Sequence, residues 1–198
     1  MGSLDLPLSD AGHRQVSAAV EKISELAVSA VYAAPCQAAL QTAEALGARL
    51  GIKVKTIDAL RNLDHGLWHG KRIEEVRQTQ PRVFRQWQEN PQTVCPPEGE
   101  MVGDAQARVR SALAKLLKKH KQGVVALIAP EPLASLIGAE LDRRAVGDLW
   151  KAGCRCGDYD VVELGEAGPK TPPAETHSPA PVDAPAPQTA PRIAGGTA

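Results

Sequence analysis

The feature that most constrains the fold is a strand joined by a tight turn to a helix, over residues 31–45, VYAAPCQAALQTAEA. The apolar run over residues 27–32 favours a buried β-strand. After the turn, apolar side chains recur at helical spacing as far as Gly51, a residue typical of helix C-termini. Pro35 marks the boundary, because proline suits the first turn of a helix but not its interior. Free N–H groups and the helix dipole make such a helix N-terminus a potential anion site.

Helices and strands alternate along the rest of the chain. We expect Ser9 and Asp104 to begin helices as N-caps, and Pro81 to break a helical stretch over residues 71–90. Further strands are predicted over residues 53–57, 124–129 and 158–164, and a further helix over residues 132–141. The continuous apolar run at 124–129 predicts a central strand buried on both faces. This alternation favours a three-layer α/β/α sandwich with a mostly parallel sheet.

Chain length and composition predict one folded domain followed by a tail. The 198 residues are 43% hydrophobic, which is enough for a single core, placed over residues 1–165. Of the last 33 residues, eight are proline and eight are alanine, and none is aromatic. Such a segment buries too little apolar surface to offset its ordering entropy, so we predict that residues 166–198 are disordered.

Charge and cysteine content exclude several classes of function. With 23 basic and 23 acidic residues the net charge is zero, so neither nucleic acid nor a membrane is predicted as a partner. No apolar run approaches the roughly 20 residues of a membrane span, and no signal peptide is visible, so a cytoplasmic location is expected. The four cysteines, Cys36, Cys95, Cys154 and Cys156, are interpreted as free thiols.

Four stretches of the sequence resemble one family. Residues 31–46 are similar to the VYSSPLQRARQTAEAL signature of the histidine phosphatase (phosphoglycerate-mutase-like) superfamily. Residues 4–12, LDLPLSDAG, resemble the segment after that family's catalytic RHG motif. Residues 59–70, ALRNLDHGLWHG, resemble ALRELDFGDWEG, and residues 124–138 resemble VLVVSHGGVIRALLG. The stretches occur in the family's order and imply its α/β/α fold.

The resemblance also implies a reaction. In active relatives a histidine attacks the phosphoryl group and the phosphohistidine is then hydrolysed by water. Arginines and a second histidine hold the phosphoryl oxygens, and a carboxylic acid protonates the leaving alcohol. The positions that match the clamp arginine, the acid and the second histidine are Ala38, Asn62 and Pro130. Glu131 follows where the family has glycine, which would place a carboxylate against a phosphate.

These substitutions predict a catalytically inactive pseudoenzyme, hence not an enzyme, with a protein-interaction or scaffolding role and no cofactor. The alternative is a phosphomonoesterase with a site rebuilt around Asp64, His65 and His69. A non-catalytic small-ligand sensor that retains the old pocket is a further alternative. The His-x₃-His pair beside a carboxylate is also a spacing that holds metals. The preferred interpretation is two loop histidines next to Trp68, so no metal site is predicted.

The family's RHG motif and its strand would fall before residue 4, so we expect a sheet that lacks the first strand. A truncated start stays open as an explanation. In the family's fold that strand lies beside the one at residues 124–129. An exposed edge on such an apolar strand is a template for pairing. Self-association or an unidentified protein partner is therefore expected at this edge.

Overall fold

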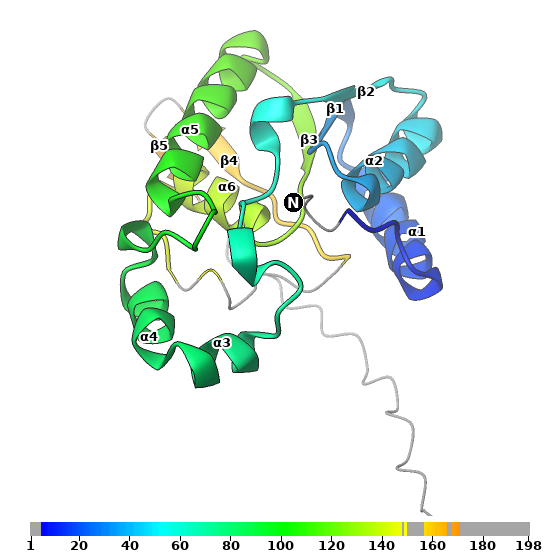
Figure 1. Ribbon diagram of the computed structural model, residues 1–198. Helices are drawn as coiled ribbons and strands as arrows, with labels where there is room; N and C mark the ends of the chain where they lie inside the picture. Colours follow the sequence, from blue (N-terminus) through cyan, green and yellow to red (C-terminus); the bar gives the residue numbers. More distant parts are fainter. Residues whose placement is uncertain (1–4, 148, 150–156, 166–167, 171–198) are drawn as a thin grey trace, which may run out of the picture.

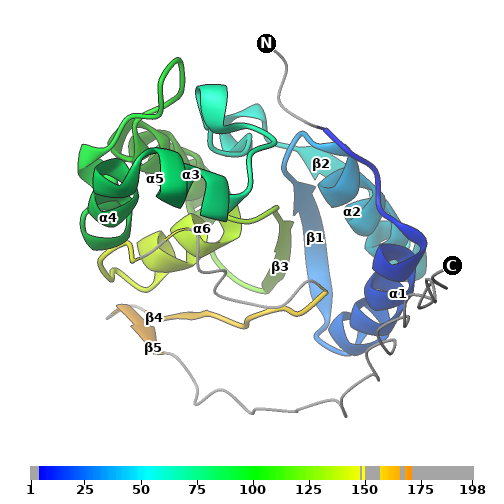
Figure 2. The ribbon, with the colours of Figure 1, turned by 60° about the horizontal axis from the view of Figure 1, so that its bottom comes forward.

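The centre of the molecule is a three-stranded parallel sheet with the order β2-β1-β3. The computed structural model describes residues 5–147, 149, 157–165 and 168–170. Helices cover both faces of the sheet, as Figures 1 and 2 show. These elements are α1 (Asp10–Ser24), β1 (Val28–Ala33), α2 (Gln37–Leu50), β2 (Val54–Thr56), α5 (Val102–Lys119), β3 (Val124–Ile128) and α6 (Leu133–Leu141). The predicted α/β/α sandwich with parallel strands is confirmed.

Local signals determine the ends of the first two helices. The hydroxyl of Ser9 accepts a hydrogen bond from the N–H of Gly12 (3.2 Å), so Ser9 caps α1 as predicted. Gly51 ends α2 with a φ of 68°, a left-handed conformation that glycine adopts without steric cost. Buried side chains of both helices pack on β1, among them Val20 and Leu46. This cluster forms one half of the core.

The second half of the core lies on the opposite face of the sheet. Pro81 separates α3 (Ile73–Thr79) from α4 (Pro81–Glu89) at the predicted break, and it occupies the start of α4. Three short 3₁₀ helices join the larger elements: η1 (Asp58–Leu60), η2 (Gly66–Trp68) and η3 (Pro91–Thr93). Trp87 and Leu60 are fully buried and pack with side chains of α5 and α6.

Two predicted strands differ from the structure. None of the residues of β3 is fully buried, and Val124 is 39% exposed, because β3 pairs on only one side among the described residues. The prediction of a central strand buried on both faces is therefore wrong. The strand predicted at residues 158–164 is restricted to β4 (Glu163–Gly165), which pairs antiparallel with β5 (Gly168–Lys170). Among the described residues, β4 therefore pairs in a short hairpin and not with the β2-β1-β3 sheet.

The predicted cap at Asp104 is also wrong. Helix α5 begins two residues earlier, at Val102, and Asp104 lies in its first turn. A carboxylate there still interacts favourably with the helix dipole, which explains why the residue suggested a helix start.

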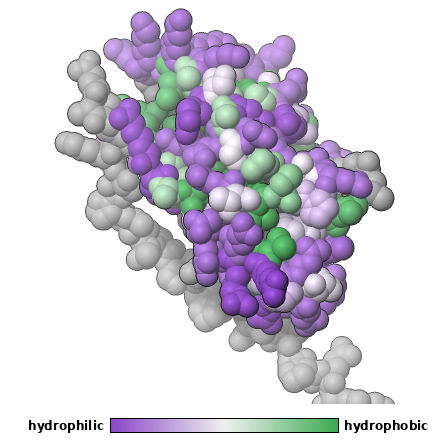
Figure 3. Space-filling view, turned by 60° about the vertical axis from the view of Figure 1, so that its left-hand side comes forward, coloured by the Kyte–Doolittle hydropathy of each residue, from purple (hydrophilic) through white to green (hydrophobic). Residues whose placement is uncertain are grey.

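None of the helices that the structure describes is both long and apolar enough to cross a membrane. On the face shown in Figure 3, hydrophobic residues form short patches between hydrophilic ones. Apart from β5, most of the predicted tail at residues 166–198 lies outside the described residues, as do Cys154 and Cys156. A protein partner or self-association at β3 stays a prediction.

Candidate active site

The carboxyl ends of β1 and β3 carry two of the positions that the family resemblance singles out. In a parallel sheet, the loops that follow these ends form the usual ligand crevice. The N–H of Ala34 donates to the backbone oxygen of Ile128 (2.9 Å), so the turns after β1 and β3 are neighbours. Ala38, in the first turn of α2, and Pro130, just after β3, therefore lie at the same edge of the sheet.

Asn62 joins this edge through its side chain. Its Nδ2 donates to the backbone oxygen of Glu131 (3.1 Å), which brings Asn62 to the segment that contains Pro130. The carboxylate of Glu131 accepts a hydrogen bond from the N–H of Ser135 (3.2 Å) near the start of α6. A helix N-terminus favours a negative charge, and here the protein's own carboxylate supplies it. The amide and the carboxylate are thus both engaged with the backbone.

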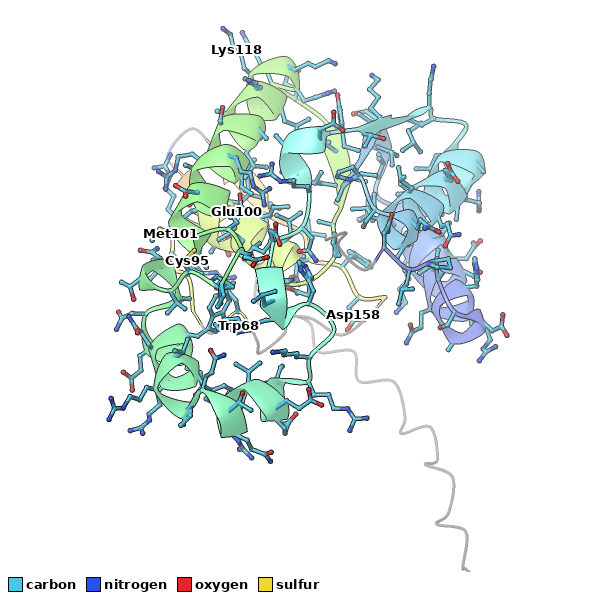
Figure 4. All side chains as sticks on the ribbon, in the orientation of Figure 1. Trp68, Cys95, Glu100, Met101, Lys118 and Asp158 are labelled. Atoms are coloured by element: carbon cyan, nitrogen blue, oxygen red, sulfur yellow. The ribbon has the colours of Figure 1, made fainter. Side chains whose placement is uncertain are left out.

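A second group of polar side chains lines a cavity of about 170 Å³ beside η2. Its lining residues are His65, Trp68, His69, Gly70, Lys71, Ile73 and Val76. Trp68, labelled in Figure 4, is buried, and Ile73 is 38% exposed. His65 and His69 line this cavity, whereas Asp64 does not line it but lies beside His69, with its Oδ1 3.5 Å from Nδ1 of that ring. Glu131, the fourth predicted pocket residue, is not among the residues that line the cavity.

His65 is held neutral by its surroundings. Burial, together with the neighbouring His69, lowers the pKa of His65 to about 4, and Asp64 partly opposes this shift. The ring of His65 contacts those of Trp87 (5.6 Å between centroids) and His69 (5.8 Å). At neutral pH the imidazole of His65 therefore carries one N–H donor and no charge.

The tautomer of His69 follows from its partners. Its Nδ1 lies 3.1 Å from the backbone oxygen of Gly66 and 3.5 Å from Oδ1 of Asp64. Both oxygens only accept hydrogen bonds, so we assign the proton to Nδ1. In the neutral ring Nε2 then carries a free electron pair, and the carboxylate of Asp64 stabilises positive charge that develops on the ring. This is the arrangement of an activated histidine nucleophile.

Arg108 of α5 holds the loop that carries these residues. Its guanidinium forms two hydrogen bonds with the carboxylate of Glu100, at 2.7 and 2.8 Å. It also donates to the backbone oxygens of Ala59 (2.8 Å), Arg61 (2.8 Å) and Asn62 (3.2 Å). The backbone of Glu100, labelled in Figure 4, donates in turn to the oxygen of Asp64 (2.8 Å). Two loops are thereby joined across one buried ion pair.

Sequence reasoning did not identify Arg108. The only available signal was its position in α5, where it lies between the buried residues Ala105, Val109 and Ala112. An arginine at the margin of an apolar stripe needs internal acceptors when it is buried. The identity of those acceptors depends on loops about 50 residues earlier in the chain, which periodicity does not reveal.

His65 and His69 are not part of a larger cluster of metal ligands in the part of the chain that the structure describes. Within these residues, no group of three or more histidine, cysteine, aspartate or glutamate side chains is placed to hold a metal ion.

Burial raises the pKa of the Cys36 thiol, which disfavours its reactive thiolate form.

Comparison with known proteins gives one family throughout. The family model described as histidine phosphatase superfamily, branch 1, matches residues 1–171. Phosphoserine phosphatase 1 of Hydrogenobacter thermophilus is 29% identical over 170 residues, which cover 83% of this chain and 78% of that protein.

Solved structures agree with this family. A mycobacterial glucosyl-3-phosphoglycerate phosphatase superposes with a TM-score of 0.66 at 28% identity, over 74% of this chain and 72% of that chain. YhfR of Bacillus stearothermophilus superposes with a TM-score of 0.74 at 22% identity, over 86% of each chain, and shows the shared fold.

These relatives correct two predictions. The chain was expected to be a catalytically inactive pseudoenzyme and not an enzyme, but the similar proteins are named as phosphatases. They favour the phosphatase alternative over a scaffolding role. The pseudoenzyme prediction gave most weight to the substituted motif positions and interpreted His65 and His69 as loop histidines, whereas both line the cavity beside η2. Since the family model covers most of its length, the chain belongs to branch 1 of the histidine phosphatase superfamily.

Proposed function

We propose that the chain is a phosphomonoesterase whose reaction takes place in the cavity beside η2. The observation that carries the proposal is the geometry of His69, whose Nδ1 is bonded to the oxygen of Gly66 next to Asp64 while Nε2 stays available. The relatives support the reaction class: their names share the hydrolysis of a phosphate monoester.

Each polar residue of the cavity has a distinct role in this proposal. Nε2 of His69 attacks phosphorus, and Asp64 stabilises the positive charge on the resulting phosphohistidine. The N–H of neutral His65 donates to a phosphoryl oxygen. Lys71 is the one cation among the described residues that line the cavity, and its ammonium balances the charge of the phosphate. Water then hydrolyses the phosphohistidine to inorganic phosphate.

Release of inorganic phosphate from a panel of phosphomonoesters tests the proposal. We expect turnover by the purified chain and its loss, by about 10²-fold or more, in His69→Gln, because covalent catalysis then has no nucleophile. His13→Gln is the matched control, since the side chain of His13 is exposed on α1 and lies far from η2 in the sequence. Acid-labile phosphohistidine should accumulate in the parent chain and be absent from His69→Gln. Turnover that survives in His69→Gln, or no turnover in the parent chain, would refute the proposal.

A further inference from the structure

We infer that the substrates of this cavity are aryl phosphomonoesters, esters whose leaving group is a phenol. The inference rests on the proposed phosphomonoesterase function and adds the chemical class of the organic group. Two separate features of the cavity carry it: the absence of a positioned acid for the leaving oxygen among the described residues, and an apolar wall formed by Trp68, Ile73 and Val76.

Among the residues that the structure describes, those that line the cavity include no carboxylic acid for the leaving oxygen. Asp64 lies beside His69, where its Oδ1 accepts a hydrogen bond from the N–H of Gly66 (2.9 Å). Asn62 is an amide, and its Nδ2 is bonded to the oxygen of Glu131. His65 is neutral and therefore a very weak acid, and Lys71 is assigned to the phosphoryl charge. The oxygen must leave without a proton from these groups.

A leaving oxygen that receives no proton favours the esters of phenols over the esters of aliphatic alcohols. A phenol such as the tyrosine side chain has a pKa of about 10, whereas water has a pKa of about 15.7, and aliphatic alcohols resemble water. A phenolate is therefore a far better leaving group than an alkoxide. An acid that protonates the leaving group accelerates such reactions by roughly 10²–10⁴. Alkyl esters lose this acceleration here, and aryl esters need it least.

The wall of the cavity fits an aromatic ring. Trp68 and Val76 are buried and Ile73 is 38% exposed, and together they give the lining an apolar side. Aromatic rings pack favourably against apolar and aromatic side chains such as these. Within the described part of the chain, the lining residues contain no carboxylate that would pair with an ammonium group. The amino-acid part of phosphoserine therefore lacks a matching partner in this cavity.

The reaction balances with water as the only co-substrate. The electron pair of His69 Nε2 forms the N–P bond while the P–O bond to the ring breaks, and the phenolate leaves with the electron pair of the P–O bond. Water then forms a new O–P bond, and the N–P bond breaks to return the pair to Nε2. The proton released from water neutralises the phenolate in solution, so the products are a phenol and hydrogen phosphate.

A series of esters separates the two features. The kcat/KM is measured for 4-nitrophenyl, phenyl and benzyl phosphate and for phosphoserine. Phenyl and benzyl phosphate have similar size and apolarity, but benzyl phosphate has an alcohol as its leaving group. We expect phenyl phosphate to exceed benzyl phosphate by about 10²-fold, the lower limit of what acid catalysis supplies. We expect 4-nitrophenyl phosphate to exceed phenyl phosphate in turn.

A pair of variants tests the apolar wall. Ile73→Asp should raise the KM for phenyl phosphate about tenfold, a loss of about 1.4 kcal/mol in binding. Leu67→Asp is the control, because Leu67 is 42% exposed and does not line the cavity. Ile73→Ser serves if Ile73→Asp does not fold.

The outcomes distinguish the inference from the proposed function. Equal rates for phenyl phosphate, benzyl phosphate and phosphoserine would overturn the aryl preference while the phosphomonoesterase function stands. An Ile73→Asp variant with an unchanged KM would overturn the apolar wall as its cause. If none of the four esters is hydrolysed, the proposed function and the inference both fail.

Discussion

Replacing Arg108 by methionine removes the link between the η2 loop and the loop at Glu100. Methionine keeps most of the volume of the side chain but has no donor. The side chains of Arg108 and Glu100 are only 13% and 12% exposed, so the carboxylate of Glu100 would lose its main partner in a largely buried place. Three backbone oxygens would lose a donor at the same time.

The expected cost is about 3 kcal/mol. Breaking a buried ion pair by removing one partner costs roughly 3–5 kcal/mol, because the remaining charge stays desolvated. Arg61 reduces that cost, since its Nη2 lies 3.2 Å from Glu100 and remains in Arg108→Met. That pair is 57% exposed at Arg61, so its compensation is small. The value should therefore fall near the lower end of the range.

Urea unfolding followed by tryptophan fluorescence measures this cost. With a slope of about 1–3 kcal/mol per molar urea, the midpoint should fall by about 1–3 M. Arg110→Met is a matched control on the same helix, since Arg110 also binds a carboxylate through two hydrogen bonds, to Glu140, but is 67% exposed. Its midpoint should change far less, because exposed ion pairs contribute little. Equal shifts for the two variants would refute the reasoning from burial.

A double variant tests the cause. If an unpaired buried carboxylate is responsible, adding Glu100→Met to Arg108→Met should recover at least about 1 kcal/mol of the lost stability. Additive losses would show that the contacts with the backbone oxygens dominate instead. Amide exchange in residues 58–70 should accelerate in Arg108→Met, because this loop then opens locally.

Three further substitutions test burial, backbone conformation and packing. The lowered pKa of His65 means that, as the pH falls, the unfolded chain binds a proton before the folded chain does. The free energy of unfolding should therefore fall by up to about 3 kcal/mol between pH 6.5 and pH 4. Thermal unfolding of His65→Gln should lack this part of the loss. Gly66→Ala should cost several times more in free energy of unfolding than Gly51→Ala. Both glycines have a positive φ, but only a Cβ at Gly66 would clash with the backbone, at the oxygen of Pro97. Equal costs for the two variants would contradict this clash. Trp87→Ala should cost about 3–5 kcal/mol in urea unfolding, since the side chain is fully buried, and a cost below about 1 kcal/mol would show that Trp87 does not pack as described.

Local chemistry in the sequence was sufficient for most of the helices. Ser9, Pro81 and Gly51 act through their own backbone or a partner three residues away, so their effect does not depend on the rest of the fold. The apolar periodicity around β1 and α2 likewise predicted which faces are buried. These signals, together with four motifs in family order, were enough to predict the α/β/α sandwich and the family.

Tertiary contacts decided the properties of the candidate site. The low pKa of His65 arises from burial, and Trp87, which packs against its ring, comes from another helix. The loop that carries His65 is held by Arg108, whose acceptors lie 46–49 residues earlier in the chain. The exposure of β3 depends on its having one neighbour among the described strands. Long-range pairing of this kind leaves no periodic trace in a sequence, because only the folded chain brings such residues within hydrogen-bonding distance.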